Sequence, residues 1–448
     1  MSPRIFRSGV FRRHNANALW VAPFFCQTMS IYTHTKSFVA SAIVLVCANV
    51  LAETPEALVK QALQRNPELN FFVAEIAAAK GAVRTAGTFR NPELSSEVGY
   101  KNSRDNSGGP SGDGAIMALS FSQTFEYPGR LALRKAIANH DLALAELHLQ
   151  QFRLTLAARV RTLAYGISSA QQKSVAAREV ASRFQALSDV LAQRPTAGVT
   201  PQLEARIIDA NTLAFQRQER DAALAIATAL AELNQLCGRP ADTPLTMVSA
   251  KVEFSPASLP RLLSAARANA FDVRIRQVEF AQQGFKVALS KNERFPAISV
   301  GPFYSMENAI DREQRAGLGI SLPLPLWDRN VGNIATSKAR QQQAEASLAM
   351  TEREVERRVA QNAAILTAKR AQIDNLKGDE LAKFREAAET ADRNYQLGAV
   401  PLTIYVETQK QYLELVGALA ELQRDALQAA QELEILTGLK LYGEEAQR

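Results

Sequence analysis

The feature that most constrains how this sequence can fold is an internal duplication. The pattern of residues 58–99 returns about 204 positions later: an amphipathic helix, a second helical stretch and then a strand. Each half goes on with a polar loop, another strand, a very long helical run broken by a Gly and a Pro, and a returning helix that ends at Gly238 or Gly438. We therefore predict a two-fold sequence repeat, with one structural unit over 53–250 and a second over 251–448.

Four segments alternate apolar and polar residues with the period of a β-strand, near 93–101, 115–127, 297–306 and 316–327. The residues between the paired strands are strongly polar. Four strands cannot close a membrane barrel, which needs about eight, and an open sheet edge in lipid leaves backbone groups without hydrogen bonds. If these strands lie in a membrane, the chain must oligomerise. Aromatic residues stand near the strand ends, where such a barrel carries an aromatic girdle: Tyr100, Tyr127, Tyr304 and Trp327.

Two nearly unbroken helical runs cover 130–194 and 332–397. A helix of about 65 residues spans roughly 95–100 Å. With their returning helices they predict helical hairpins over 130–238 and 332–438. Apolar residues recur every seven positions, as in packed coiled-coil-like helices, so we interpret them as structural packing. They include Leu142, Leu149, Leu156 and Leu163 in the first hairpin, and Leu415, Leu422, Ala429 and Leu436 in the second.

The N-terminal residues 1–52 have the composition of a secretory signal peptide. An apolar run over 38–51 follows Lys36 and ends before Ala52, so we expect cleavage before Glu53, with Met29 as a candidate start. Val46 precedes Cys47 where a lipobox usually has Gly, Ala or Ser, and we do not expect lipidation. Cys237 then remains alone and predicts a buried small hydrophobic residue rather than a disulfide.

Charge and motifs exclude several classes of function. The leader holds five of the 52 basic residues and no acidic one, so the rest of the chain is nearly balanced and has no concentrated basic face for nucleic acid. No metalloprotease, P-loop or nucleophile-elbow motif occurs, which argues against an enzyme and against a cofactor. His140 and His148 lie about 80° apart around a helix, and we expect them to face solvent rather than bind a metal.

The residues resemble the TolC family of outer-membrane efflux proteins over nearly all of the chain after the leader. The resemblance rests on NPEL boxes at 66–69 and 91–94, and on the hairpin tips AGVTPQLEA (197–205) and YQLGAVPLTIYVETQ (395–409). The segment PLPLWDRNVGNIATSKA (323–339) is most similar to the CzcC-like branch, which serves heavy-metal cation efflux.

The resemblance implies an α+β membrane protein with three copies in the assembly. A single twelve-stranded outer-membrane barrel, with four strands from each chain, would continue into a periplasmic α-helical barrel. It also implies a periplasmic adaptor and an inner-membrane pump of the RND type as partners, besides the outer-membrane lipid. The implied function is passive conduction of substrate, heavy-metal cations in this branch. Drug efflux or type I protein secretion would share the fold, and a periplasmic coiled-coil adaptor or scaffold is an alternative of another class.

The same resemblance assigns roles to the hairpin tips. Gly198, Pro201, Gly398 and Pro401 would form the turns that contact the adaptor, since glycine permits a sharp reversal and proline fits a first helical turn. In the family, acidic residues narrow the periplasmic entrance and hydrogen bonds between helices close it. Glu407 keeps one of two acidic positions after Gly398, the other being Ile404, and Val400 replaces a basic residue of the lock. Tyr395 would donate a hydrogen bond to Glu204 across this gate.

Overall fold

The computed structural model describes most of the chain after the leader, and all of these residues belong to one unit. The predicted signal peptide, with Met29 and Cys47, lies outside the described residues, as does Gly198. None of the helices described is long and apolar enough to cross a membrane. The described residues are 53–193, 199–245, 247, 252–255, 257–309, 311–376 and 379–444.

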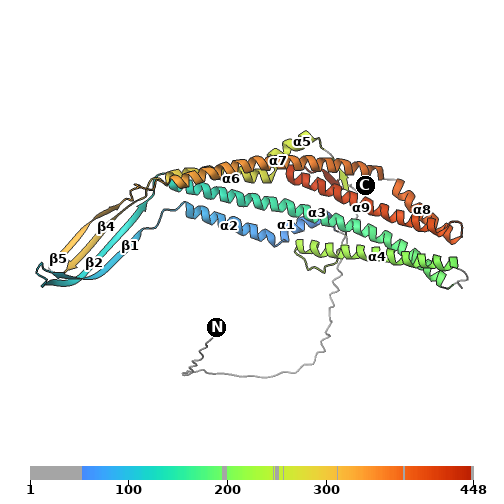
Figure 1. Ribbon diagram of the computed structural model, residues 1–448, viewed down its shortest axis with the longest axis horizontal. Helices are drawn as coiled ribbons and strands as arrows, with labels where there is room; N and C mark the ends of the chain where they lie inside the picture. Colours follow the sequence, from blue (N-terminus) through green and yellow to red (C-terminus); the bar gives the residue numbers. More distant parts are fainter. Residues whose placement is uncertain are drawn as a thin grey trace, which may run out of the picture. The chain divides into compact units, whose positions relative to one another are not determined.

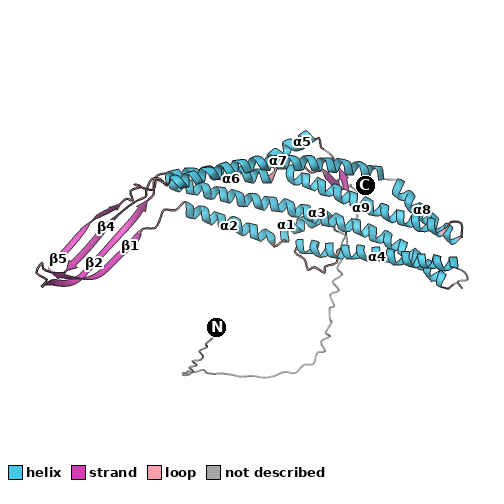
Figure 2. Cartoon of the chain, in the orientation of Figure 1, coloured by secondary structure: helices cyan, strands magenta, loops and turns pink. Residues whose placement is uncertain are grey.

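Helices form most of the fold (Figure 1, Figure 2). Two short pairs, α1 with α2 and α5 with α6, each precede a β-hairpin, and the long helices α3, α4, α7, α8 and α9 follow the hairpins. The helices are α1 Pro55–Arg65, α2 Glu68–Ala86, α3 Arg130–Ala192, α4 Val199–Leu236, α5 Leu259–Asn269, α6 Phe271–Asn292, α7 Val331–Leu376, α8 Asp379–Gln396 and α9 Leu402–Thr437.

The first NPEL box makes the corner between α1 and α2. Asn66 is buried, and its Oδ1 accepts a hydrogen bond from the Glu68 amide at 2.8 Å, which satisfies a free N–H at the start of α2. Its Nδ2 donates to the Leu236 carbonyl at the end of α4. Asn269, at the end of α5, donates in the same way to the Thr437 carbonyl at the end of α9. One asparagine in each half thus joins a short helix to the last turn of a long one.

The long helices follow the predicted patterns. The helix α3 has 63 residues, and it packs against α4 and α6 as well as α9. Leu149 and Leu156 of its heptad series are buried, and so are Ala429 and Leu436 of α9. The run predicted over 332–397 is described as α7, which ends at Leu376, and α8, which begins at Asp379, and residues 377 and 378 lie outside the described part of the chain.

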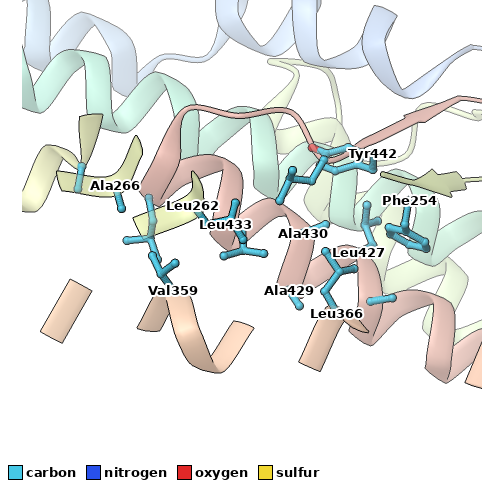
Figure 3. Close-up of a cluster of buried hydrophobic side chains, with 14 of the residues drawn as sticks. Phe254, Leu262, Ala266, Val359, Leu366, Leu427, Ala429, Ala430, Leu433 and Tyr442 are labelled. Carbon is cyan, nitrogen blue, oxygen red and sulfur yellow. The ribbon is translucent and has the colours of Figure 1, made fainter. Parts of the chain in front are cut away.

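The buried side chains form three clusters between the helices. Figure 3 shows the one in which α9 packs against α5 and α7. The two-stranded sheet of β3 (Val252–Phe254) and β6 (Tyr442–Glu444) closes this cluster through Phe254 and Tyr442. Cys237 is fully buried beside Leu58 in another cluster, and burial raises the pKa of its thiol, as expected for a structural cysteine.

The other four strands form an antiparallel sheet in the order β1-β2-β4-β5 (Figure 1). Its strands are β1 Glu93–Arg104, β2 Pro110–Phe125, β4 Ile298–Asn308 and β5 Arg312–Ser321. Two tight hairpins are joined edge to edge through β2 and β4. The strands run further into the polar segments than predicted, so the turns between them are short. Along the described strands, β1 and β5 each have one edge without a partner.

The register sorts the side chains onto two different faces, because residues paired across strands point to the same side. Tyr304 pairs with both Leu119 and Ala316, and Val98 pairs with Met117. One face is therefore mainly apolar: Leu94, Val98, Tyr100, Met117, Leu119, Phe121, Val300, Tyr304, Leu318 and Ile320. The opposite face is mainly polar or glycine: Ser95, Glu97, Gly99, Ser120, Ser122, Ser299, Ser305, Glu307, Gly319 and Ser321.

The fourth strand differs from the prediction at its end. The alternation predicts a strand to Trp327, but β5 ends at Ser321. Pro323 and Pro325 have no N–H to donate to a ladder, which explains why pairing stops although the apolar alternation goes on. Trp327 therefore lies beyond the sheet, while Tyr100 and Tyr304 lie within β1 and β4 rather than at their ends.

Candidate functional site

The helix α8 ends in a sharp turn whose backbone amides donate hydrogen bonds to the last turn of the helix. The Ala399 amide donates to the Asn394 carbonyl at 2.8 Å, and the Gly398 amide donates to the Tyr395 carbonyl at 2.9 Å. This is a Schellman motif, which requires a left-handed residue after the helix. Gly398 supplies it with φ +74°, and Pro401 is the N-cap of α9. The predicted turn residues therefore have a backbone reason for their identity.

The turn between α3 and α4 is described in part. The helix α3 ends at Ala192 and α4 begins at Val199, so Pro201 lies in the first turn of the returning helix. The predicted glycine of this turn, Gly198, lies among the residues that the structure does not describe.

An open pocket of about 800 Å³ lies between the two helical hairpins near these turns. It brings together four of the predicted residues: Glu204 from α4, Tyr395 from α8, and Gly398 and Pro401 from the second turn. The end of α3 forms the opposite wall. The remaining polar lining comes from Ser182, Arg183, Asp392 and Gln396.

A buried polar group lies behind this pocket. Gln409 of α9 is fully buried, and its Nε2 donates to the Ala388 carbonyl at 2.7 Å. Its Oε1 accepts from Nη1 of Arg183 at 3.4 Å, so one side chain connects α3, α8 and α9. Because a buried amide without partners is costly, these contacts fix how the helices pack at this end.

Tyr405 is the second buried group behind the pocket. Its ring stacks between Phe184 and Tyr395, with centroid distances of 4.9 and 5.1 Å. Burial, reinforced by the Asp392 carboxylate, raises the pKa of the Tyr405 hydroxyl far above its usual value, so the hydroxyl stays protonated. That hydroxyl and Oδ1 of Asp392 are both buried, and neither has a partner with ordinary hydrogen-bond geometry.

The third predicted gate residue lies apart from this group. Glu407 is exposed on α9 and does not line the pocket. Its Oε1 accepts a hydrogen bond from Gln411 one turn further along, at 3.0 Å. The hydrogen bond from Tyr395 to Glu204 stays a prediction, although both side chains line the same pocket.

Sequence reasoning missed the buried side of this site. Arg183, Asp392, Tyr405 and Gln409 were not singled out. A signal was present for Gln409, because it occupies a position in α9 whose helical neighbours Leu402, Tyr405 and Leu413 are all buried. A polar side chain on an apolar helix face needs partners, and that need could have indicated a buried hydrogen bond at Gln409, although not the identity of its partner.

The histidines stand elsewhere. Nδ1 of His140 lies 3.0 Å from the Ala136 carbonyl, and its ring contacts Phe285. His148 lines a separate pocket between α3, α6 and α7. We expected both to face solvent, and in the structure both are partly exposed. Among the residues described, no three His, Cys, Asp or Glu side chains gather in a way that could hold a metal ion.

Comparison with known proteins gives consistent results. The sequence is 21% identical over 352 residues to the cobalt-zinc-cadmium resistance protein CzcC of Cupriavidus metallidurans, covering 77% of this chain and 80% of that protein. The fold is similar to the crystal structure of CusC, with a TM-score of 0.68, 18% identity and coverage of 86% and 92%. It is also similar to the Campylobacter jejuni CmeC outer membrane channel, with a TM-score of 0.66, 16% identity and coverage of 88% and 87%.

The profile of one protein family matches the chain twice. Its two matches, residues 58–239 and 262–439, take in both pairs of short helices, the four-stranded sheet and the long helices. That family is one of outer-membrane channels rather than of enzymes. By this match the chain belongs to the outer membrane efflux protein family, the TolC family of channels, and its place is the outer membrane and the adjoining periplasm.

Proposed function

We propose that three copies of this chain close one twelve-stranded barrel and form the outer-membrane channel of a tripartite efflux system. The observation that carries the proposal is the sheet. Its two outer edges, on β1 and β5, have no partner within the described chain, and one face is apolar and exposed. Lipid does not tolerate unpaired strand edges. Pairing β1 of one copy with β5 of the next gives both edges a partner and leaves the apolar face to contact lipid.

The polar face of the sheet would then line the lumen. Serine and glycine predominate on this face, which also carries the charged residues Glu97, Lys101 and Glu307. Small side chains leave room for a water-filled passage, as barrels with a polar interior do. The helices would continue this passage through the periplasm.

The two halves of the chain would be copies of one ancestral unit, over 53–250 and 251–448. Three observations support this duplication. The order of helices and strands is the same in both halves, with α7 and α8 together in the place of α3. Asn66 and Asn269 make equivalent contacts to the last turns of α4 and α9. The family profile also matches each half separately.

The helical turns near Pro201 and Gly398 would face a periplasmic adaptor, which in turn recruits an inner-membrane pump of the RND type. The pocket between the two hairpins supports this assignment, because it is open and mixed in polarity, as a docking groove for another helix should be. Exposed apolar side chains beside it, Leu203 and Leu397, add contact surface.

Glu204 and Tyr395 would hold the entrance closed, and three copies of Glu407 would form an anionic ring that attracts cations. The exposure of Glu407 and its separation from the buried group support a carboxylate that faces the passage. Heavy-metal cations are the substrates that we favour, because CzcC is described as a cobalt-zinc-cadmium resistance protein. Drug efflux is the second candidate, because a channel for drugs would share this fold, and the fold alone does not distinguish the cargo.

The cargo is tested in a strain that lacks this channel. The strain should become sensitive to cobalt, zinc or cadmium salts, and the chain should restore growth. Restored growth on antimicrobial compounds but not on metals would favour drug efflux.

Conductance of the purified channel in planar bilayers tests the roles proposed for Glu407 and Tyr395 at the entrance. We expect Glu407→Ala to weaken cation selectivity and block by multivalent cations, and Tyr395→Phe to raise open probability. The exposed carboxylate Glu386 on α8 gives the matched control, and Glu386→Ala should change neither property.

A further inference from the structure

An ion pair on the polar face of the sheet reaches across an entire strand. Lys101 of β1 pairs with Glu307 of β4, although β2 lies between these two strands. Neighbouring strands lie about 4.8 Å apart, so the backbones of β1 and β4 are separated by roughly 10 Å. The β2 residue opposite Lys101 is Gly114, which has no side chain to block the path. This glycine leaves the lysine room to reach the carboxylate.

The backbone at the end of β4 lies on this same face. Residues paired across strands point to one side, so a Cβ at Gly114 would point to the side that carries Lys101. Such an atom would overlap the Asn308 carbonyl and lie 2.9 Å from Cα of Ala309. Ala309 is buried, whereas no residue of the four strands is. Beyond its last pair with β2, at Glu307, the chain thus passes over the polar face of β2.

Two more charged residues complete a balanced group on this face. Glu313 of β5 pairs directly with Glu307, and Arg315 pairs with Ser305, so both lie on the side of Lys101. Like charges directly opposite each other repel. Each carboxylate has a cation of its own, because Nη2 of Arg315 lies 2.7 Å from Oε2 of Glu313. The two ion pairs together therefore carry no net charge.

This charged group lies at the end of the sheet that is far from the helices. The strand β4 follows α6 and begins at Ile298 (Figure 1). Glu307 lies about 30 Å further along this strand, at a rise of about 3.3 Å per residue. The hydrocarbon core of a bilayer is also about 30 Å thick. In the proposed barrel the group therefore stands at the outer mouth, on the wall of the passage.

We propose that Lys101, Glu307, Glu313 and Arg315 form a charge-balanced exit site, from which hydrated cations leave the barrel without being held. Conduction requires that an ion bind weakly enough to leave. Without the two basic residues, Glu307 and Glu313 of three copies would form a ring of carboxylates, which are ligands that divalent cations prefer. Lys101 and Arg315 occupy these carboxylates instead. This inference rests on the proposed function, because it takes the polar face of the sheet as the lining of the passage.

Conductance of the purified channel in planar bilayers tests the exit site. The protein is added to one compartment, and the outer mouth opens to the other, because the large helical part cannot cross the bilayer. Lys101→Met removes the ammonium group and should raise the cation-to-anion permeability ratio at least about twofold. It should also strengthen block by Ca²⁺ added on the side of the outer mouth, while block from the other side stays as in the wild type. Glu307→Gln should lower the permeability ratio.

The two single variants separate charge from structure, since both break the same ion pair but should shift selectivity in opposite directions. The double variant Lys101→Met with Glu307→Gln restores the balance and should conduct like the wild type. Arg315 is 69% exposed, so Arg315→Gln removes a positive charge at a site that tolerates substitution, and it should raise the ratio as Lys101→Met does.

The outcomes for the exit site and for the channel are distinct. Shifts in the same direction for Lys101→Met and Glu307→Gln, or no shift in either of them or in Arg315→Gln, would overturn the exit site and leave the channel standing. A wild-type protein that inserts but does not conduct would contradict the proposed function itself.

Discussion

The helical part and the four-stranded sheet differ in how much of their apolar surface the chain itself buries. The helices bury large side chains in three clusters, with Phe184, Leu58 and Leu433 fully inaccessible. In the sheet, no residue of β1, β2, β4 or β5 is buried. Val98, for example, is 76% exposed. The helical part therefore has a core of its own, whereas the sheet has none, which fits our proposal that lipid and further copies of the chain cover it.

The largest expected effect comes from breaking the sheet where two backbones meet. A Cβ atom at Gly301 would lie 1.6 Å from the Phe121 carbonyl oxygen, so Gly301→Val cannot keep β2 paired with β4. We expect loss of the heat-modifiable oligomer on gels and of protein in the outer-membrane fraction.

Gly99 gives the matched control for that substitution. It lies on the same face of the sheet, in β1, and a Cβ there would meet nothing within 4 Å. Gly99→Val should therefore assemble like the wild type. Normal assembly of Gly301→Val would show that the β2–β4 junction does not hold the sheet together.

The second prediction concerns the helical core. Leu433 is fully buried among α5, α7 and α9, and Leu433→Ala removes contacts and leaves a cavity. We expect a loss of about 2–5 kcal/mol in the free energy of unfolding, measured by denaturant titration followed by circular dichroism. Leu213, which is 69% exposed on α4, is the control, and Leu213→Ala should change stability by less than about 0.5 kcal/mol. Equal losses at both positions would contradict a self-contained helical core.

The third prediction separates the helical turns from both the core and the sheet. Gly398 has φ +74° with open space around it, so Gly398→Val strains the backbone by about 1–2 kcal/mol without a clash. The oligomer should persist while export fails. Gly398→Asn should retain most export, because asparagine tolerates the left-handed conformation. Wild-type export by a stable Gly398→Val oligomer would exclude a role for the shape of this turn.

The smallest effect is expected at an ion pair between α1 and α3. Glu56 of α1 receives two hydrogen bonds from Arg161 of α3, at 3.0 and 3.1 Å, and Lys440 lies beside it. Burial tends to raise the pKa of Glu56, but the hydrogen bonds and charges of Arg161 and Lys440 lower it overall. The stabilisation is thus present above the unfolded pKa near 4.3 and is lost as pH falls through the lower folded pKa.

Replacing the carboxylate should remove this dependence on pH. Glu56→Gln should cost less than about 1 kcal/mol at neutral pH, because the Glu56 side chain is 42% exposed and water screens its charge. The difference between wild type and variant should shrink as the solution is acidified. A difference that stays constant from neutral to acid pH would mean that the pair contributes through packing rather than through charge.

The sequence predicted the parts of this fold that depend on local pattern. The period of α3 and the alternation of β2 could be recognised because helices and strands place side chains at fixed intervals. The end of β5 was predicted too late in the chain, because the apolar alternation continues past Ser321 although Pro323 and Pro325 cannot donate to the ladder. The contact between Arg183 and Gln409 joins positions far apart in the chain, and no local pattern encodes such a pair. Glu204 and Tyr395 line one pocket in the structure. The resemblance to the family, rather than a local pattern, had predicted both residues as part of the gate.

The mass of the purified protein decides whether other copies of the chain complete the sheet. We propose that two further copies pair with its two open edges. Protein extracted from the outer membrane in mild detergent should have the mass of three chains, by native mass spectrometry or by light scattering corrected for detergent. A folded, monodisperse monomer that retains its β-structure would contradict the claim.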